Sequence, residues 1–275
     1  MNTRSESAKN TYPSEGVRYS EAAPHTTTIG HYLLSVSLSA AQLLDLWEQG
    51  AKLPPYAQAL LLLSAVFPTL TQDELADWSL GQRDAALLEL HALLFGTSIE
   101  ALAACPHCAA QTSLHFQAAD VRAAYAPTEL PALVTSFESH NFVLRLRPVT
   151  SAMIAAVKDG RRERLLLECI ITAERDGVAL MPADLPSEVL ARCEARVAEA
   201  DPQADIRLAL HCLECGQQWN AVFDPLSFLW REIEHWAERM LREVHVLASA
   251  YGWDEAHILG LSAARRRRYL EMVIA

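Results

Sequence analysis

The chain has 275 residues, 51% of them hydrophobic, and a formal net charge of −11. This length and composition allow a sizeable buried core and exclude an intrinsically disordered chain. The acidic balance argues against general affinity for nucleic acid or anionic membrane, because a phosphate-binding protein usually carries a broad basic surface. We therefore do not expect nucleic acid as a partner.

The first part of the chain, residues 1–28, is rich in Ser, Thr, Glu and Ala and predicts a flexible tail. It contains no charged segment followed by an apolar run, so we expect no secretory signal and a cytoplasmic protein. The most apolar stretch, Ala57–Phe67, is too short to cross a bilayer and is followed by Pro68. We therefore expect no membrane span.

Residues 29–104 predict a helical N-terminal region. Ser39 suits a helix N-cap, Pro54 and Pro55 suit a helix start, and Thr71 with Glu74 matches a capping box. The elements that we expect here are a strand at Tyr32–Leu38, helices from Ser39 to near Gly50, from Pro55 to Phe67, after Thr71 and at Gln82–Phe95, and a short helical turn at Ser98–Ala104.

The central part predicts a helical insert at 125–205 between two β segments. The β segments, at 105–124 and 206–224, each combine a cysteine pair with alternating polar and apolar residues. Around the cysteines we expect strands at Gln111–Phe116, Ile206–His211 and Gln217–Phe223. Within the insert we expect a loop at Tyr125–Val134, a strand at Phe142–Arg147 and helices at Ser151–Val157, Arg162–Ala173 and Ser187–Ala198.

The C-terminal part, residues 225–275, predicts one long helix and two short ones. Pro225 opens the long helix, apolar residues recur along it in steps of three and four, and Gly252 ends it. The short helices are expected at Trp253–Leu259 and Ser262–Val273. The predicted fold class is thus mainly α with a small β part (α+β), a helical frame joined to a split zinc-ribbon-like module with an insert between its two halves.

Two Cys-x-x-Cys pairs are the strongest chemical signal in the sequence. Six cysteines in a chain without a secretory signal favour metal binding over disulfides, because the cytosol keeps thiols reduced. Two such pairs supply the four thiolates of a closed tetrahedral site, and zinc is its natural occupant. We therefore predict one structural zinc ion per chain, held by Cys105, Cys108, Cys212 and Cys215.

Alternatives to this shared site stay open, because 103 residues separate Cys108 from Cys212. The pairs could be two independent thiol pairs or reduced core cysteines, and His107 or His211 could replace a cysteine as ligand. The other two cysteines, Cys169 and Cys193, lie on apolar faces of predicted helices and are interpreted as core residues.

Signatures of common enzymes are missing. The chain has no glycine-rich phosphate loop, no Gly-x-Ser-x-Gly elbow and no His-Glu-x-x-His helix. Four thiolates would also close the coordination sphere of a metal, whereas a catalytic zinc needs an open position. We therefore expect no catalytic residues, no small-molecule substrate and a protein that is not an enzyme.

The one charge run is formed by four consecutive arginines, Arg265, Arg266, Arg267 and Arg268. Four consecutive residues of a helix point in almost every direction, so some of them must face neighbours or a partner. We interpret the run, with Trp253, as a candidate partner-binding surface. The alternative is a solvated helix whose arginines interact favourably with its dipole and pair with Glu271 or nearby acids, with Trp230, Trp236 and Trp253 in the core.

Several segments carry a resemblance to a known family. They are Gly81–Leu88, Leu94–Gly96, the two cysteine pairs, Ala200–Asp205, Phe223–Trp230, Arg242–His245, Ala250–Trp253, Ile258–Ser262 and Arg265–Leu270. Over roughly residues 40–275 the chain resembles the T-even-type bacteriophage baseplate (hub/assembly) protein family, in the form found in bacterial contractile injection (phage-tail-like) gene clusters. The resemblance implies a component or assembly factor of a contractile-tail baseplate or hub, with other baseplate or hub proteins as partners.

Two functional hypotheses follow. In the first, the protein is a structural or assembly module, in the cytoplasm or within an assembled particle, whose zinc clamps the insert onto the helical frame. In the second, it is a zinc-ribbon nucleic-acid-binding or regulatory protein that uses the arginine run on phosphates, with binding that weakens steeply with salt. The acidic balance favours the first.

Overall fold

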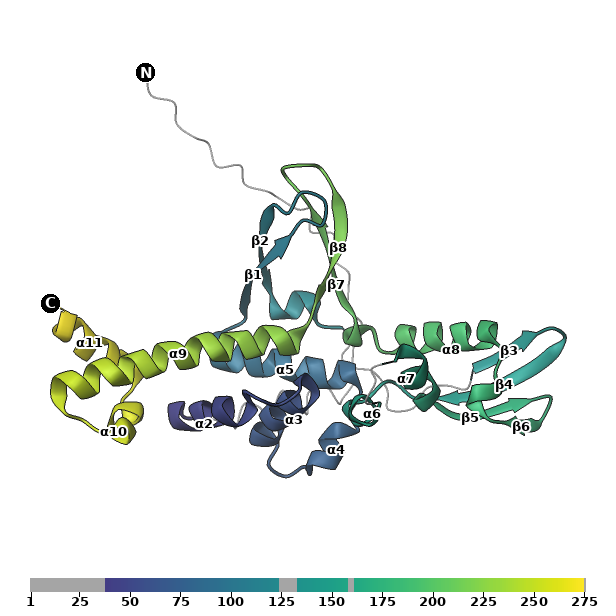
Figure 1. The fold of residues 1–275 in the computed structure, drawn as a ribbon, viewed down its shortest axis with the longest axis horizontal. Coiled ribbons are helices and arrows are strands. Elements are labelled where there is room, and N and C mark those ends of the chain that lie inside the picture. Colours follow the sequence, from purple (N-terminus) through teal and green to yellow (C-terminus); the bar gives the residue numbers. More distant parts are fainter. Residues whose placement is uncertain (1–37, 124–132, 158–160, 275) are drawn as a thin grey trace, which may run out of the picture.

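The computed structural model describes residues 38–123, 133–157 and 161–274. A body of helices lies at the centre, a pair of β-hairpins projects from it, and a small β-sheet with its helices lies at one end (Figure 1). The predicted α+β class is therefore confirmed. The predicted tail at 1–28 lies outside the described residues, as does the predicted strand except for its last residue, Leu38.

Three of the four N-terminal helices begin where the sequence predicts, and the fourth begins two residues earlier. They are α2 (Ala40–Gly50), α3 (Pro55–Val66), α4 (Gln72–Ala76) and α5 (Leu80–Phe95). Ser39, Thr71 and Ser79 each accept a hydrogen bond from the backbone N–H three residues on, and the side chain there bonds back to form a capping box. The box between Ser79 and Gln82 explains why α5 begins two residues before its predicted start.

The main core lies between α3, α5 and the first half of α9 (Pro225–Tyr251). The apolar residues of α3 surround its axis, which suits a helix buried on several sides. Burial of a leucine side chain contributes about 1.5–3 kcal/mol, so this cluster holds the body together. Its fully buried members are Ala59, Leu62, Leu63, Val66, Leu75, Ala86, Leu87, Leu90, Leu229 and Ile233.

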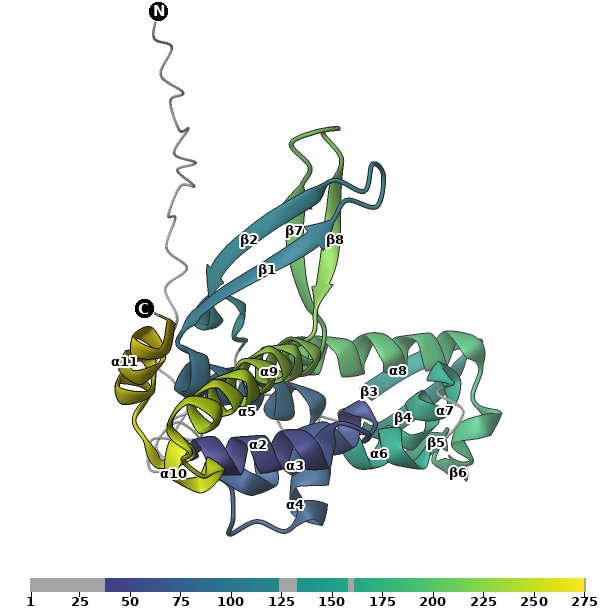
Figure 2. The same cartoon turned by 60° about the vertical axis from the view of Figure 1, so that its left-hand side comes forward.

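Two antiparallel hairpins form a projection that we call the hairpin arm (Figures 1 and 2). The first joins β1 (Ser98–Ala104) to β2 (Gln111–Gln117), and the second joins β7 (Ile206–His211) to β8 (Gln218–Phe223). The predicted helical turn at Ser98–Ala104 is wrong, because all seven of these residues pair with β2. Alternating burial in β1, with Ile99 inside, overrides the helix propensity of its alanines.

The segment between the hairpins is a mixed lobe, which we call the β-lobe. Its sheet has the order β3-β4-β5-β6, and its helices are α6 (Ser151–Ala156), α7 (Arg162–Glu168) and α8 (Ser187–Ala200). The strands are β3 (Leu133–Phe137), β4 (His140–Leu146), β5 (Ile170–Arg175) and β6 (Val178–Leu180).

Three predictions within the β-lobe need correction. The helix predicted to reach Ala173 ends at Glu168, because Ile170 to Arg175 pair with β4 and bury Ile170 and Ala173. The predicted loop overlaps β3 at its last two residues, and its other residues, 125–132, lie outside the described residues. The insert predicted as mainly helical therefore contains a four-stranded sheet.

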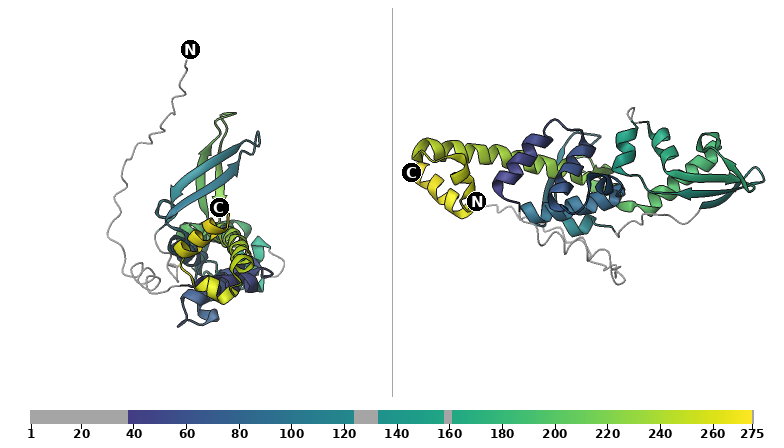
Figure 3. Two further views of the ribbon diagram at one scale, coloured as in Figure 1. Left: turned by 90° about the vertical axis from the view of Figure 1, so that its left-hand side faces the viewer. Right: turned by 90° about the horizontal axis from the view of Figure 1, so that it is seen from below.

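The C-terminal helices occupy the end of the molecule opposite the β-lobe (Figure 3). Gly252 ends α9 in the left-handed conformation at φ 68°, as predicted, and α10 (Glu255–Gly260) and α11 (Ala263–Ile274) then fold back against α9. No helix in the described part of the chain is long and apolar enough to cross a membrane.

Candidate metal centre

The two cysteine pairs occupy the loops at the tips of the hairpin arm. Cys105 and Cys108 lie in the loop between β1 and β2, and Cys212 and Cys215 lie in the loop between β7 and β8. The two tips meet away from the helical body (Figures 1 and 2). The cluster therefore links hairpin to hairpin, and the expected clamp between insert and frame is wrong.

All four cysteine sulfurs converge on one point. They lie within 4.8 Å of one another, and two sulfur–sulfur contacts cross between the hairpins. Cys105 Sγ lies 3.7 Å from Cys215 Sγ, and Cys108 Sγ lies 3.6 Å from Cys212 Sγ. This arrangement can bind a metal ion, as the spacing of the pairs predicted.

The backbone makes the same turn around both pairs. Ala109 N–H donates to Cys105 O at 2.9 Å, and Gly216 N–H donates to Cys212 O at 3.0 Å. Both donors have positive φ, 59° for Ala109 and 73° for Gly216. The turn lets backbone N–H groups approach the sulfurs, which stabilises thiolates.

Hydrogen bonds shift the acidity of the thiols. Burial of the Cys105 thiol opposes ionisation, but hydrogen bonds from the backbone N–H groups of Cys108 and His107 lower its pKa to about 6. The Gln217 N–H favours the Cys215 thiolate, but burial and the neighbouring sulfurs raise the pKa of Cys215 to about 12. One thiolate in the cluster thus disfavours a second, and a cation placed between the sulfurs would remove that conflict.

The remaining cysteines and histidines lie elsewhere. Cys169 and Cys193 are fully buried in the core of the β-lobe, as predicted, and burial raises the pKa of each thiol to about 11. His107 and His211 are exposed beside the knuckles. Among the described residues, the only group close enough to hold a metal is the four cysteines, so the alternative of histidine ligation gains no support.

Aromatic packing fixes the base of the hairpin arm on the body. Phe116 of β2 meets Phe223 of β8 edge-on at a centroid distance of 5.4 Å, and Phe223 contacts Phe228 of α9 at 5.5 Å. Ile99 and Ile206 join the same buried cluster. Apolar packing thus holds the arm at its base, while the four cysteines come together at its tip.

The arginine run divides into buried and exposed members. Arg266 is buried, and its guanidinium bonds Glu243 of α9 at 3.2 Å and the Leu261 carbonyl at 2.6 Å, so it fixes α11 in place. Arg265, Arg267 and Arg268 are exposed, and Arg268 pairs with Glu271. Arg266 is therefore unavailable to a partner, in contrast to the predicted four-residue surface.

Trp253 lies in an aromatic cluster at the end of α9. Its ring stacks on Tyr251 at a centroid distance of 4.7 Å and meets Tyr269 of α11 edge-on at 4.9 Å. It is half-buried, so it supports the fold of the C-terminal helices and is still partly exposed to solvent.

A buried polar joint was missed in the sequence analysis. Asp201, in the turn η3 (Pro202–Ala204) that follows α8, accepts a hydrogen bond from Gly81 N–H of α5 at 3.0 Å. Gln203, also buried, accepts one from Ala123 N–H beyond β2. Both halves of the joint belong to segments that carry the family resemblance, but 120 positions separate Gly81 from Asp201, so nothing local indicated their contact.

The geometry so far defines a class: an α+β protein with a projecting hairpin arm and a four-cysteine cluster at its tip that can bind a metal ion. Residues 60–230 match the family described as T4 bacteriophage base plate protein. The match covers more than half of the chain, so the chain belongs to this family. No curated protein and no solved structure matches it.

Proposed function

We propose that this chain is a non-enzymatic structural or assembly protein of the baseplate of a contractile, phage-tail-like injection system, stabilised by one structural zinc ion. The membership of the T4-type baseplate family carries the proposal. Its partners would be other baseplate or hub proteins, met in the cytoplasm during assembly or within the assembled particle.

Zinc is the proposed metal because the sulfur distances fit it. A tetrahedron with zinc–sulfur bonds of about 2.3 Å has edges of about 3.8 Å. The two sulfur pairs that cross between the hairpins lie at 3.7 Å and 3.6 Å, and all four sulfurs lie within 4.8 Å of one another. Cys105, Cys108, Cys212 and Cys215 would hold the ion. The bound ion would supply charge neutralisation and a rigid link between the hairpin tips, and no open position for catalysis.

The proposed role of this link is to fix the shape of the hairpin arm. Each hairpin has only two strands, which is too few for independent stability in water. A link at the tips makes the two hairpins support each other. A partner protein would then meet a rigid surface, and the exposed Leu213 at the tip is one side chain that it would contact.

A second contact surface is proposed at the C-terminal helices. The exposed Arg265, Arg267 and Arg268 of α11 give a local positive charge on a chain of net charge −11, which suits an acidic surface of a partner. Trp253, in the connection between α9 and α10, packs against Tyr269 of α11, so its exposed part lies beside this helix.

Metal content and stability test the proposal together. Protein purified without chelator should contain one zinc per chain by mass spectrometry, and Cys105→Ser with Cys212→Ser should lose the metal and melt at a lower temperature. The matched control, His107→Gln with His211→Gln, should keep both. Absence of metal, with the same melting temperature in the variant, would contradict the proposed structural zinc. The family membership would then be the only support for the proposed function.

Hydrogen exchange locates the effect of the metal. Addition of a chelator should speed amide exchange at the tips of both hairpins while the core of α3 and α5 stays protected, because the core makes no contact with the cysteines. Global loss of protection would instead mean that the metal holds the entire fold.

The alternative function, zinc-ribbon binding to nucleic acid, has one test. If it were correct, affinity for DNA or RNA would be measurable at physiological salt and would fall steeply as salt rises. We expect no such binding, and baseplate proteins from the same gene cluster should instead be retained in pull-downs.

A further inference from the structure

Two strands of the hairpin arm border one groove. It has a volume of about 560 Å³ and is lined by Thr112–Phe116 of β2 and Arg207–His211 of β7, together with Asp120, Val121 and Leu213. In the described part of the chain each hairpin is a sheet of two strands, so β2 pairs only with β1 and β7 only with β8. One edge of β2 and one edge of β7 therefore have no neighbouring strand there.

The groove follows the edges of these strands rather than the face of a sheet. Successive side chains of a strand point to opposite faces, so a groove bordered by consecutive residues of a strand runs along its edge. Leu114 and Leu208 are half-buried on the inner side, whereas Ser113 and His115 are exposed on the outer side. An extended segment in the groove would therefore have apolar neighbours on one side and polar neighbours on the other.

The backbone hydrogen bonds show which groups of β2 point away from β1. In an antiparallel pair, residues that exchange backbone hydrogen bonds alternate with residues whose N–H and C=O groups point outward. Ala118 N–H donates to Thr97 O at 2.9 Å, and the register continues from there without a shift along β1 and β2. By this alternation, Ser113 and His115 direct their backbone groups to the free edge.

The same alternation applies to β7. Cys212 N–H donates to Gln217 O at 2.8 Å next to the tip, and the register again continues without a shift. Arg207, Ala209 and His211 therefore direct their N–H and C=O groups away from β8. Like the edge residues of β2, they line the groove, so both of its strands offer backbone donors and acceptors.

The edge of β2 is open to a further strand. Natural proteins block such edges with features that include proline, lysine and β-bulges. Strand β2 has none of these three, and its residues in the groove carry no permanent charge. Strand β7 differs, because Arg207 adds a charge at its edge. A further strand is thus expected on β2, with β7 as the opposite wall of the groove.

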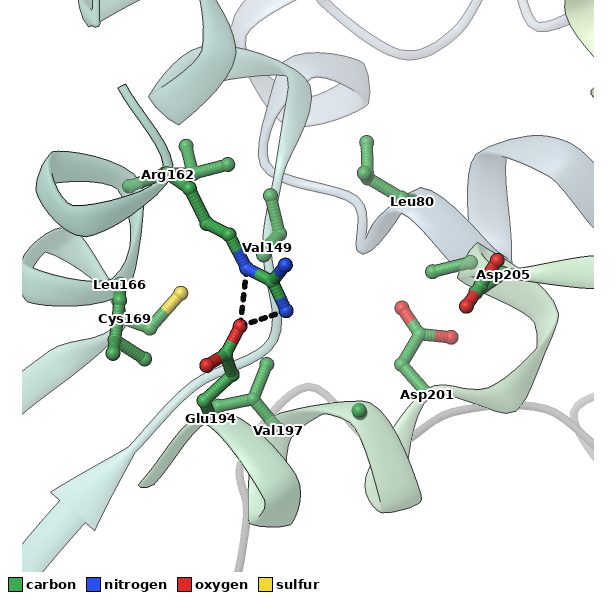
Figure 4. A pocket seen from close by; sticks show the side chains of 12 residues that line it. Leu80, Val149, Arg162, Leu166, Cys169, Glu194, Val197, Asp201 and Asp205 are labelled. Atoms are coloured by element: carbon green, nitrogen blue, oxygen red, sulfur yellow. Dashed lines mark hydrogen bonds and ion pairs between the residues drawn. The ribbon is translucent and has the colours of Figure 1, made fainter. Parts of the chain in front are cut away.

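A smaller cavity offers no such pairing. It has a volume of about 250 Å³ and lies where the β-lobe meets the body (Figure 4). Helices α7 and α8 form much of its wall, and the backbone groups within a helix are already bonded to one another. An ion pair between Arg162 and Glu194 borders it (Figure 4). The groove in the hairpin arm is therefore the better site for an extended segment.

We propose that an extended segment of a partner baseplate protein binds in this groove as a strand added to the free edge of β2. Backbone hydrogen bonds to Ser113 and His115 hold it, and its apolar side chains, at alternate positions, pack beside Leu114 and against Leu208 of β7. This inference rests on the proposed function, which supplies the partner.

Charge selects the outer side chains of the segment. His115, Arg207 and His211 lie on the outer side of the groove, and the strand residues there include no carboxylate. Two acidic neighbours, Glu100 and Asp205, lie 3.7 Å and 2.9 Å from the first two, but all four side chains are more than half exposed and such pairs are weak. Acidic side chains on the segment therefore suit the groove better than basic ones.

Amide hydrogen exchange on the full-length protein, purified without chelator, tests the groove. The probe is a blocked hexapeptide of valine and glutamate in alternation. It should slow exchange of the Ser113 and His115 amides saturably and at least fivefold, with a Kd in the millimolar range typical of a small ligand. No change at these amides, or equal binding of the same peptide with lysine in place of glutamate, would overturn the proposal.

Backbone methylation of the peptide separates strand pairing from side-chain contact. One version carries N-methyl groups on all valines and a second on all glutamates, and in a strand only one of these two sets of N–H groups faces β2. One version should therefore bind at least tenfold more weakly than the unmodified peptide. Unchanged binding of both versions would contradict an added strand.

Proline variants of the protein assign the edge. Ser113→Pro removes a backbone donor of the free edge without removing a bond to β1, and should weaken the peptide at least tenfold. Leu102, the cross-strand partner of Ser113, directs its N–H to the opposite edge of the hairpin, so Leu102→Pro is the matched control and should bind like the wild type. Weakening by Ala209→Pro but not by Ser113→Pro would place the strand on β7 and overturn the proposal. If Ser113→Pro failed to fold, the methylated peptides on the wild type would still decide.

Two further outcomes concern other occupants. Slow exchange of the Ser113 and His115 amides in the free protein would show that the edge is already paired and would overturn the proposal. Slow exchange at every protein concentration would assign the groove to a segment of this chain, and slow exchange only at high concentration would assign it to a second copy.

Purified baseplate proteins from the same gene cluster separate this inference from the proposed function. A partner that binds the wild type should bind Ser113→Pro more weakly, and equal binding would overturn the added strand while the proposed function stood. Failure of every such protein to bind the wild type would contradict the proposed function itself, and with it the partner named here, whatever the result with the peptide.

Discussion

Ala109 and Gly216 occupy equivalent positions in the two cysteine turns, and both adopt positive φ. Glycine enters this region without steric cost, whereas a residue with a Cβ pays about 1–2 kcal/mol. The second turn therefore has the residue that its backbone requires, and the first turn is strained at Ala109.

The first prediction follows from this difference. Ala109→Gly should raise the free energy of unfolding by about 1 kcal/mol, and Gly216→Ala should lower it by a similar amount. A Cβ at Gly216 would have no atom within 4 Å, so the loss there would come from the backbone alone. Denaturant titration of both variants checks this, and effects of the same sign would contradict it.

Asp84 gives a prediction about pH. Burial raises its pKa from 3.8 to about 6, against the attraction of Arg83. Folding therefore favours the neutral carboxyl. The contribution of Asp84 to the free energy of unfolding is fully present below about pH 4. It is lost as the pH rises to about 6, and the free energy of unfolding falls by about 3 kcal/mol over this range.

The variant Asp84→Asn is neutral at every pH and should lack this decline. The free energy of unfolding of the wild type minus that of the variant should fall between pH 4 and pH 6. This difference cancels effects common to both proteins, including release of metal in acid. Asp77→Asn, the same change at an exposed position, is the control, and a difference that rises with pH would refute the assignment.

The roles of some single residues could be predicted from the sequence, and the roles of others could not. The four cysteines were predictable because their spacing has few uses other than a metal site, and their convergence bears out the prediction of one shared cluster. The role of Arg266 could not be predicted, because the sequence alone does not show which of four consecutive arginines contacts Glu243.

At the scale of elements, capped helices were predicted well and short strands less well. Ser39 and Thr71, the two predicted caps, form local capping boxes whose signal lies within four residues, whereas the box at Ser79 was missed. The strands β1 and β5 depend on partners in β2 and β4, and their alanines and charged residues favour helix in isolation. Tertiary pairing overrode that local preference.

The attachment of α11 gives a prediction at this scale. Arg266→Ala would leave the largely buried Glu243 without its partner and should cost about 2–3 kcal/mol, with release of α11 from α9. Arg267→Ala, an exposed neighbour, should change stability by less than about 0.5 kcal/mol. Limited proteolysis near the C-terminus and thermal unfolding measure both effects, and equal effects would show that Arg266 has no special role.

At the scale of the whole molecule, the joint at Gly81 holds the three main parts together. The turn η3 follows α8 of the β-lobe and precedes β7 of the hairpin arm, and Asp201 fixes it to α5 of the body. The sequence predicted the parts in their order, but it could not predict this contact between distant segments.

Gly81→Ala tests the joint. An added Cβ would lie 1.7 Å from Asp201 Oδ1 and 3.0 Å from Gln203 Cβ, so α5 and η3 must separate, and the variant should lose about 2 kcal/mol or more. Gly260→Ala, where a Cβ has open space, should change stability by less than about 1 kcal/mol. Thermal unfolding compares them, and a mild effect at Gly81 would mean that the joint yields easily.

The two hairpin tips can meet only after both cysteine pairs have been synthesised. Cys105 leaves the ribosome 110 positions ahead of Cys215. At a synthesis rate of about 5–20 residues per second, the first pair waits roughly 5–20 s for the second. During that interval the nascent chain presents an exposed dithiol on a hairpin that has no partner, and the entire β-lobe is synthesised before the pair can close.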